Sequence, residues 1–246
     1  IDAGSVSATI ASASGGNFES LVVDPAAATT TITDTLDVTT ISLTASASVA
    51  EGGNITYTAS LNNAADTPVS VTLSNGAIIS ITAGAFSGSV SIPAPSDDVY
   101  VDAGNVSATI VSATGGNFES LTIDPAAATT TITDTIDTTT VSLTASASVA
   151  EGGSIVYTAS LDNPAGTPVT VTLSNGASIA IAAGASSGSV SVLAPAEDVY
   201  IDAGSISATI FSATGGNFEA IAIDPAAATT SITDTVDVTT VSLTAS

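Results

Sequence analysis

Apolar and polar residues alternate with a period of two in short runs along most of the chain. In residues 138–237 these runs include SIVYTASL, PVTVTLS and GSVSVLAP, which are rich in β-branched residues and bounded by turn sequences such as EGG and SNGA. Alternation of this kind, with turn signals about 8–12 residues apart, is typical of the strands of a β-sandwich. Helix-length patterns with a 3.6-residue period are missing. The pattern therefore predicts an all-β fold.

The same stretch can be divided into seven predicted strands, A to G. The last of them is expected to be broken near Asp224 and Pro225, because proline cannot donate a ladder hydrogen bond. The predicted strands cover residues 139–146, 154–161, 168–174, 177–183, 188–193, 205–212 and about 217–235.

A long repeat decides the organisation of the chain. IDAGSVSATIASASGGNFES at residue 1 returns as VDAGNVSATIVSATGGNFES at 101 and IDAGSISATIFSATGGNFEA at 201, a period of 100 residues without insertion or deletion. This period is longer than the roughly 20–50 residues of a solenoid unit. It suits a tandem array of whole β-sandwich domains.

The seam between domains is expected in the TDTIDTTT stretch. This places complete domains at 38–137 and 138–237, the C-terminal part of another at 1–37, and the first strand of a following one at 238–246. The chain does not begin with Met and shows no signal sequence. We therefore expect it to be a piece of a longer array.

The charge balance excludes several classes of partner. The 246 residues include 23 acids and no Lys, Arg or His, for a formal charge of −23, while 44% of residues are hydrophobic. The apolar content favours folding over disorder. The missing basic residues argue against nucleic acid and anionic membranes, and no run approaches the roughly 20 apolar residues of a membrane helix. The sequence predicts neither nucleic-acid binding nor membrane insertion, and favours cations as partners.

The predicted strand order gathers many of the acids. If the strands run alternately up and down, the A–B and E–F loops and the end of strand G lie at one pole of each domain, next to the following domain. Six carboxylates of the first complete domain are expected there: Glu51, Asp97, Asp98, Asp102, Asp134 and Asp137. The next domain offers Glu151, Glu197, Asp198, Asp202, Asp234 and Asp237, and the incomplete first one retains Asp2, Asp34 and Asp37.

Such a group of acids without a basic partner predicts a cation site. Many hard oxygen ligands without His or Cys favour Ca²⁺ over zinc or copper. The alternative is that these acids are solvated turn residues that cap backbone N–H groups. Glu119 and Asp124 leave a similar choice between a second ion within the domain and turn chemistry, whereas Asp66 and Asp162 are predicted to be surface residues.

The remaining side chains argue against catalysis. Without His, Cys, Lys or Arg, only carboxylates and hydroxyls could act, so a non-enzyme is predicted. The aromatic residues Tyr57, Tyr100, Phe118 and their copies recur once per repeat, which favours core packing over a binding surface. Phe86, replaced by Ser186 in the next copy, is predicted to lie on the surface.

The unit TDTIDTTTVSLTASASVAEGGSIVYTASL, together with the DVYIDAG motif, resembles the extender repeats of giant bacterial RTX (repeat-in-toxin) adhesins. The resemblance covers essentially the whole chain. It implies seven-strand, Greek-key type, Ig-like β-sandwiches joined end to end and rigidified by calcium, on the surface of a bacterium or secreted from it. The GGxGxDxUx nonapeptide of RTX proteins is absent.

These observations predict a spacer that projects a distal adhesive domain, whose ligand the sequence does not reveal, for attachment or biofilm formation. Its expected partners are calcium ions and the neighbouring repeats of the same chain. Two alternatives stay open: a self-assembling extracellular filament or matrix protein, and a repeat that itself binds a glycan or a protein.

Overall fold

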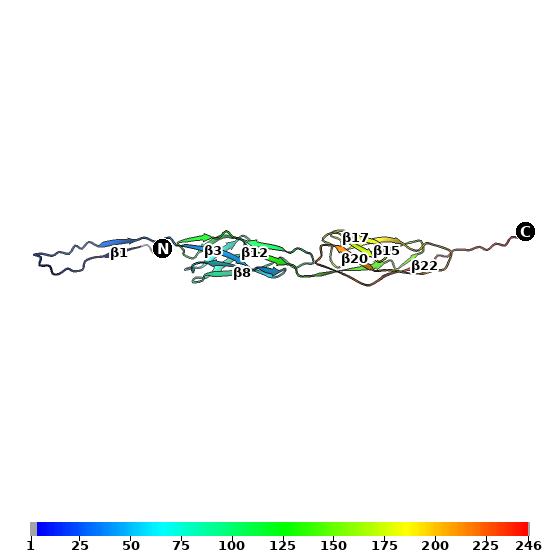
Figure 1. Ribbon diagram of the computed structural model, residues 1–246, viewed down its shortest axis with the longest axis horizontal. Helices are drawn as coiled ribbons and strands as arrows, with labels where there is room; N and C mark the ends of the chain where they lie inside the picture. Colours follow the sequence, from blue (N-terminus) through cyan, green and yellow to red (C-terminus); the bar gives the residue numbers. More distant parts are fainter. Residues whose placement is uncertain (1–3, 246) are drawn as a thin grey trace. The chain divides into compact units, whose positions relative to one another are not determined.

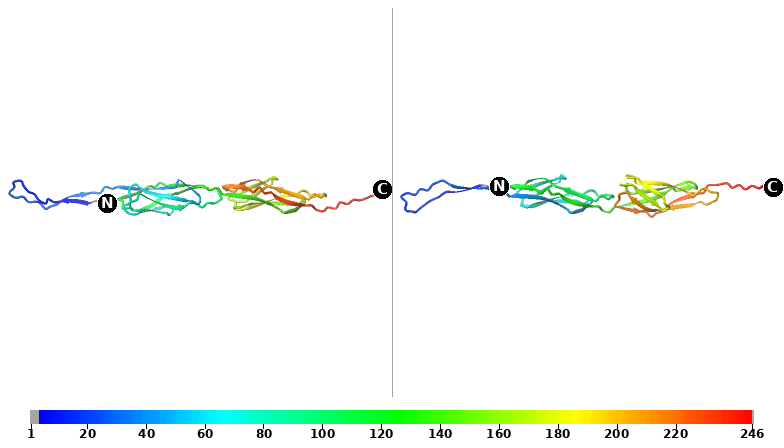
Figure 2. Two further views of the ribbon diagram at one scale, coloured as in Figure 1. Left: turned by 90° about the horizontal axis from the view of Figure 1, so that it is seen from below. Right: turned by 45° about the horizontal axis from the view of Figure 1, so that its top comes forward.

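The computed structural model describes residues 4–245, so the predicted acid Asp2 lies outside the described part. Every regular element among these residues is a β-strand, as Figures 1 and 2 show. Within the same residues, no helix has the length and apolar character needed to cross a membrane. The predicted all-β fold of tandem β-sandwich domains is confirmed.

The described chain divides into two compact units. Unit 1 contains the described residues up to Val49 together with Gly53–Ala94 and Asn105–Thr131. Unit 2 contains Ala50–Gly52, Pro95–Gly104 and the described residues from Ile132 onwards. Three short segments of the first complete repeat therefore belong to unit 2: Ala50–Gly52, Pro95–Gly104 and residues 132–137.

The largest sheet of unit 2 has four strands. Its order is β18 (Ser187–Leu193), β15 (Ser154–Leu161), β13 (Thr138–Ala145) and β21 (Ala220–Ile223). Antiparallel pairs join β18, β15 and β13, whereas β13 and β21 are parallel, with Thr138 opposite Ala220.

Two three-stranded sheets complete unit 2. One has the order β17 (Ser178–Ile181), β16 (Val169–Leu173) and β20 (Ile210–Gly215). The other has the order β14 (Ser148–Ala150), β22 (Ala228–Thr233) and β19 (Gly204–Ala208). Strands β15, β17, β20 and β22 can be followed by their labels in Figure 1.

The predicted strands largely coincide with the observed ones, with two differences. Strand G breaks as predicted, into β21 and β22, and Asp224 accepts a 2.9 Å hydrogen bond from the Ala226 N–H in the break. Predicted strand F is also broken, into β19 and β20, and the register of β20 against β16 shifts between Thr172 and Leu173. The short strand β14 was not predicted.

The strands of the first complete repeat correspond to those of the second. The four-stranded sheet contains β11 (Ser120–Ile123), β3 (Val38–Ala45), β5 (Asn54–Leu61) and β8 (Ser87–Pro93). A three-stranded sheet contains β10 (Ile110–Gly115), β6 (Val69–Leu73) and β7 (Ile78–Ile81). The remaining counterparts are β4 (Ser48–Ala50), β9 (Gly104–Ala108) and β12 (Ala128–Thr133), and an exposed antiparallel pair, β1 (Gly4–Ala8) and β2 (Ala28–Ile32), precedes them.

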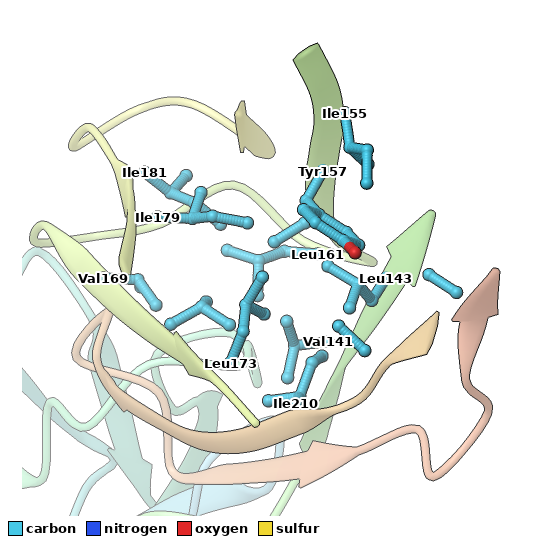
Figure 3. Packing of buried hydrophobic residues seen from close by; sticks show 14 of the residues in the cluster. Val141, Leu143, Ile155, Tyr157, Leu161, Val169, Leu173, Ile179, Ile181 and Ile210 are labelled. Atoms are coloured by element: carbon cyan, nitrogen blue, oxygen red, sulfur yellow. The ribbon is translucent and has the colours of Figure 1, made fainter. Parts of the chain in front are cut away.

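The core lies between the sheets and follows the alternation seen in the sequence. In β15 every second side chain is buried, from Ile155 and Tyr157 to Leu161. Figure 3 shows these side chains packed with Leu143 of β13 and Leu173 of β16. The prediction that Tyr57 and its copy pack in the core is confirmed, because both rings are fully buried.

Candidate metal centre

The register of the small sheet brings three acidic side chains to one end of the second repeat. Strands β14 and β22 are parallel, with Ala150 opposite Thr233, so Glu151 and Asp234 each follow directly at the same end. Strand β19 is antiparallel to β22, with Gly204 opposite Ile232. Asp202, two residues before Gly204, therefore reaches the same place as Asp234, two residues after Ile232.

The carboxylates of Glu151, Asp202 and Asp234 form one cluster, in which an oxygen of each lies within 4.8 Å of the others. The counterpart cluster of Glu51, Asp102 and Asp134 has the same property, and all three of its residues belong to unit 2. Backbone bonds fix the glutamates: the Glu51 N–H donates to the Thr133 carbonyl and the Glu151 N–H to the Thr233 carbonyl, each at 3.1 Å. The sequence-predicted meeting of three separate segments is thus seen in the geometry of both copies.

The glutamate of each cluster is buried without a complete set of hydrogen bonds. Glu51 is 6% exposed and Glu151 is 7% exposed. The Oε2 atom of each glutamate, and the Oδ1 atoms of Asp134 and Asp234, are buried and accept no hydrogen bond within the described part of the chain. Buried polar atoms normally have a partner, so these atoms identify a place where one is needed.

Neighbouring acids and burial raise the pKa of the glutamate in each cluster. A hydrogen bond with Asp102 raises the pKa of Glu51 from 4.5 to about 7, and burial and the charge of Asp102 act in the same direction. The charges of Asp134 and Asp98 add to this rise in the pKa. The pKa of Glu151 rises to about 7 in the same way, first through its hydrogen bond with Asp202. Because the sequence contains no basic side chain, either a proton or a bound cation must relieve the repulsion.

The other predicted ligands of the E–F loop lie outside the close cluster. Asp97 accepts a short hydrogen bond from Thr135 Oγ1. Asp98 accepts a 2.8 Å bond from the Tyr100 N–H, and Asp198 does the same for Tyr200. The backbone bonds of Asp98 and Asp198 match the turn chemistry that was the stated alternative. The charge of Glu197 nevertheless raises the pKa of Glu151, as that of Asp98 does for Glu51.

Asp137 interacts with a residue that the sequence did not connect to it. Its N–H donates to Glu219 Oε2 at 2.6 Å, and the Asp37 N–H donates to Glu119 Oε2 at the same distance. Glu219 Oε1 is buried and accepts no bond among the described residues. The parallel pairing of β13 with β21 explains the contact, because it places residue 219 beside residue 137.

The remaining predicted acids are spread over turns and small cavities. Asp37 and Glu119 line a cavity of about 410 Å³, and Asp234 and Asp237 line one of about 240 Å³. Asp124 accepts a 3.0 Å bond from the Ala126 N–H, which is turn chemistry. Asp34, Asp66 and Asp162 are exposed, as the surface prediction requires for the last two.

The chemistry of the cluster fits a hard cation. All of its side-chain donors are carboxylate oxygens, which suit Ca²⁺ or Mg²⁺ rather than zinc or copper. Its buried oxygen atoms without partners are the positions at which an ion would bind. Residues Glu51, Asp102 and Asp134, and their counterparts in the second repeat, are therefore the ones that could hold a metal ion.

A search of curated proteins found no match to this chain. Among solved structures, the native conformation of E. coli alpha-2-macroglobulin, determined by cryo-electron microscopy, is similar over 85% of this chain at 10% identity and a TM-score of 0.27. The chain spans only 18% of the length of that protein, and so weak a likeness carries no argument.

A family model gives a clearer result. The model of the LapA domain matches residues 1–35, 37–135 and 137–235, which is nearly the whole chain. The matched segments follow the 100-residue period of the sequence. The exact domain division at 37/38, 137/138 and 237/238 stays a prediction. The chain belongs to the LapA domain family, whose repeats it carries in tandem.

Proposed function

We propose that this chain is a spacer segment of a large secreted bacterial adhesin, and that calcium bound by its acidic clusters stiffens the joints between repeats. The LapA family indicates an adhesin-related repeat region of a cell-surface or extracellular protein. The observation that carries the calcium proposal is the buried glutamate of each cluster, which has neighbouring acids and no basic side chain to neutralise it.

Calcium would be held by carboxylates from three separate segments. Glu51 follows β4, Asp102 lies between β8 and β9, and Asp134 follows β12. Calcium takes about six to eight oxygen ligands, so backbone carbonyls and water would complete its shell. Asp97 and Asp98 in the same loop, and Asp137 in the linker, are the further candidate ligands.

The cluster lies where an ion could restrict movement between repeats. Asp134 is followed within a few residues by β13, the first strand of the next repeat. An ion that ties Asp134 to Glu51 and Asp102 would fix the chain just before this linker. Without the ion, repulsion among the carboxylates would favour separation of the three segments. In this proposal the repeats act only as a spacer, and another part of the protein binds the target.

The experiment is small-angle scattering and thermal unfolding of the full chain in calcium and then in chelator. The proposal expects calcium to raise the unfolding temperature and to narrow the range of overall dimensions that the chain adopts in solution. Chelator should reverse both changes. Sodium chloride at matched ionic strength is the control. If neither rigidity nor unfolding temperature responds to calcium, the calcium-stiffened spacer is wrong.

A repeat that itself binds a glycan or protein is a second candidate, favoured by aromatic residues exposed in one repeat and missing from the other. Phe86 is 56% exposed where the next repeat has Ser186, and Phe211 is 76% exposed where the previous repeat has Val111. Each is a single exposed side chain, which is common on protein surfaces. Binding of the chain to glycan arrays that is lost in Phe86→Ser and Phe211→Val would support this candidate over the spacer.

A further inference from the structure

Residues 99–101 of the first complete repeat contact the second repeat. We call them the tail segment. Although they precede the linker, they belong to unit 2 and pair with the turn that follows β20. The Val101 N–H donates to the Asn217 carbonyl at 3.0 Å, and the Glu219 N–H donates to the Val99 carbonyl at 3.1 Å. Tyr100 and Phe218 thus form an antiparallel bridge.

Side chains reinforce this bridge. The Tyr100 and Phe218 rings are stacked, with centroids 5.7 Å apart and an interplanar angle of 20°. The Tyr100 hydroxyl donates to the Pro164 carbonyl at 2.7 Å, and Asn217 Nδ2 donates to the Val101 carbonyl at 3.3 Å. Each of these contacts uses a neutral group.

The surface that receives the tail segment consists of residues 164–166 and 216–219. We call it the receiving surface. Gly166 makes room for the tyrosine: a Cβ at this position would lie 3.1 Å and 3.2 Å from two ring carbons of Tyr100. The first repeat has Asp66 at the equivalent position, and there Asp66 Oδ2 accepts a 3.0 Å bond from Asn117 Nδ2. In the second repeat, the equivalent amide of Asn217 donates to the tail segment instead.

The two copies of the tail segment differ in their exposure to solvent. Val99 and Tyr100 are partly buried and pack against the core cluster of unit 2. Their copies Val199, Tyr200 and Ile201 are 59%, 72% and 92% exposed. The prediction that Tyr100 and its copy are core residues is therefore wrong for Tyr200. The same apolar segment is thus packed against a following repeat at residues 99–101 and is exposed at residues 199–201.

We propose that residues 199–201 dock onto the receiving surface of a further repeat, one that carries glycine at the position of Gly166. The contact at residues 99–101 identifies the partner. It needs a Gly-Asn-Phe-Glu turn whose backbone pairs with the docking segment and whose phenylalanine stacks on the tyrosine ring. It also needs a glycine, without a side chain, beneath that ring. The Asp66 type of receiving surface is the poorer partner. This inference goes beyond the calcium proposal, because it gives the repeats a second joint and an order of pairing.

The bridge can be tested by amide hydrogen exchange of the full chain in chelator. Val101 should be protected and its twin Ile201 should exchange freely. Tyr100→Ala should accelerate exchange at Val101 and Glu219 by about tenfold or more, because the ring stack and the hydroxyl bond are lost. Tyr200→Ala is the matched control and should leave both amides unchanged. Equal exchange at Val101 and Ile201, or unchanged protection in Tyr100→Ala, would overturn the proposal.

Gly166→Asp tests the receiving surface with a residue that the sister repeat already accommodates. The Gly166 N–H bonds the Gly216 carbonyl, as the Asp66 N–H bonds that of Gly116, so the fold should persist. Exchange at Val101 should accelerate about fivefold or more, because the tyrosine is crowded and the Asn217 amide is diverted. Protection that stays at the wild-type level would show that glycine is not required.

The partner itself is tested by lengthening the chain. Insertion of a second copy of residues 138–237 after Asp237 supplies a receiving surface with glycine, and Ile201 should become as protected as Val101. Insertion of a copy of residues 38–137 supplies the aspartate type and should protect Ile201 less. No protection with either insert would overturn the docking proposal. A failure of calcium to bind would leave this exchange pattern in chelator intact, so the two proposals fail separately.

Discussion

Replacing the buried glutamate of one cluster should change stability in opposite directions with and without calcium. At pH 8, above the raised pKa of about 7, Glu151 is ionised beside Asp202 and Asp234. Glu151→Gln removes that charge while keeping the size of the side chain. In chelator, the variant should unfold at the same or a higher temperature than the wild type, because repulsion has decreased. In calcium it should unfold at a lower temperature, because a ligand has been lost.

The size of the calcium effect follows from mass action. Extracellular calcium modules have dissociation constants of about 10⁻⁴–10⁻³ M, so ~10 mM calcium exceeds the constant by about 10- to 100-fold. Binding to the folded state alone then stabilises a domain by about 1.4–2.7 kcal/mol. For a domain of about 100 residues, this corresponds to an increase of about 6–20 °C in unfolding temperature. The variant should lose most of this increase in the second repeat and keep it in the first.

The assay is differential scanning calorimetry of the wild type and variant, each in chelator and in ~10 mM calcium. Asp162→Asn is the matched control for charge. Asp162 Oδ2 accepts a 3.2 Å bond from the Thr140 N–H, and in the first repeat Asn62 accepts the same bond from Thr40 at 2.8 Å. This control should respond to calcium like the wild type. If Glu151→Gln also keeps the full calcium response, the ion does not bind at this cluster.

Three further changes test the electrostatics and the packing. In chelator, the free energy of unfolding should fall as pH rises from about 5 to 8. Glu51 and Glu151 hold protons in the folded state up to pH about 7 but lose them near pH 4.5 in the unfolded state. Urea titrations that show a rise over this window would contradict the prediction. Tyr157→Phe should leave the free energy of unfolding unchanged or raise it by up to about 1 kcal/mol, because the buried Tyr157 hydroxyl has no partner among the described residues; a loss in urea titration would mean that the hydroxyl is satisfied. Gly215→Ala should lower the urea midpoint by an amount equivalent to about 1–3 kcal/mol, because φ is +98° and a Cβ would lie 2.2 Å from the Pro168 carbonyl oxygen; an unchanged midpoint would show that this turn can relax.

Most of the strands could be predicted from the sequence because burial in this fold follows period-two alternation. Residues 154–161 alternate cleanly and form β15 over the predicted range. Strand β14 has only three residues, too few for alternation to show, and it depends on pairing with β22, far along the chain. Between β19 and β20 the chain changes its pairing partner from β22 to β16, and no proline or glycine marks this change in the sequence.

The candidate site was predictable to the extent that strand direction determines it. Glu51, Asp102 and Asp134 each lie next to a strand end, so the direction of the strands is enough to bring them to one pole. The partner of Asp137 could not be found in this way. Its contact with Glu219 requires the parallel register of β13 and β21, which the up-and-down order of strands does not specify.

The two complete repeats show that nearly identical sequences can have different surroundings. Asn117 and Asn217 have φ values of 54° and 55°, so the turn that carries the following phenylalanine is the same in both repeats. Yet Phe218 is 8% exposed beneath Tyr100, whereas Phe118 is only partly buried. The stack with Tyr100 accounts for the burial of Phe218. In an array of this kind, stability is a sum of contributions within repeats and between neighbours. The exposed Val199, Tyr200 and Ile201 are therefore the part of the second repeat whose contribution depends on what lies next to it.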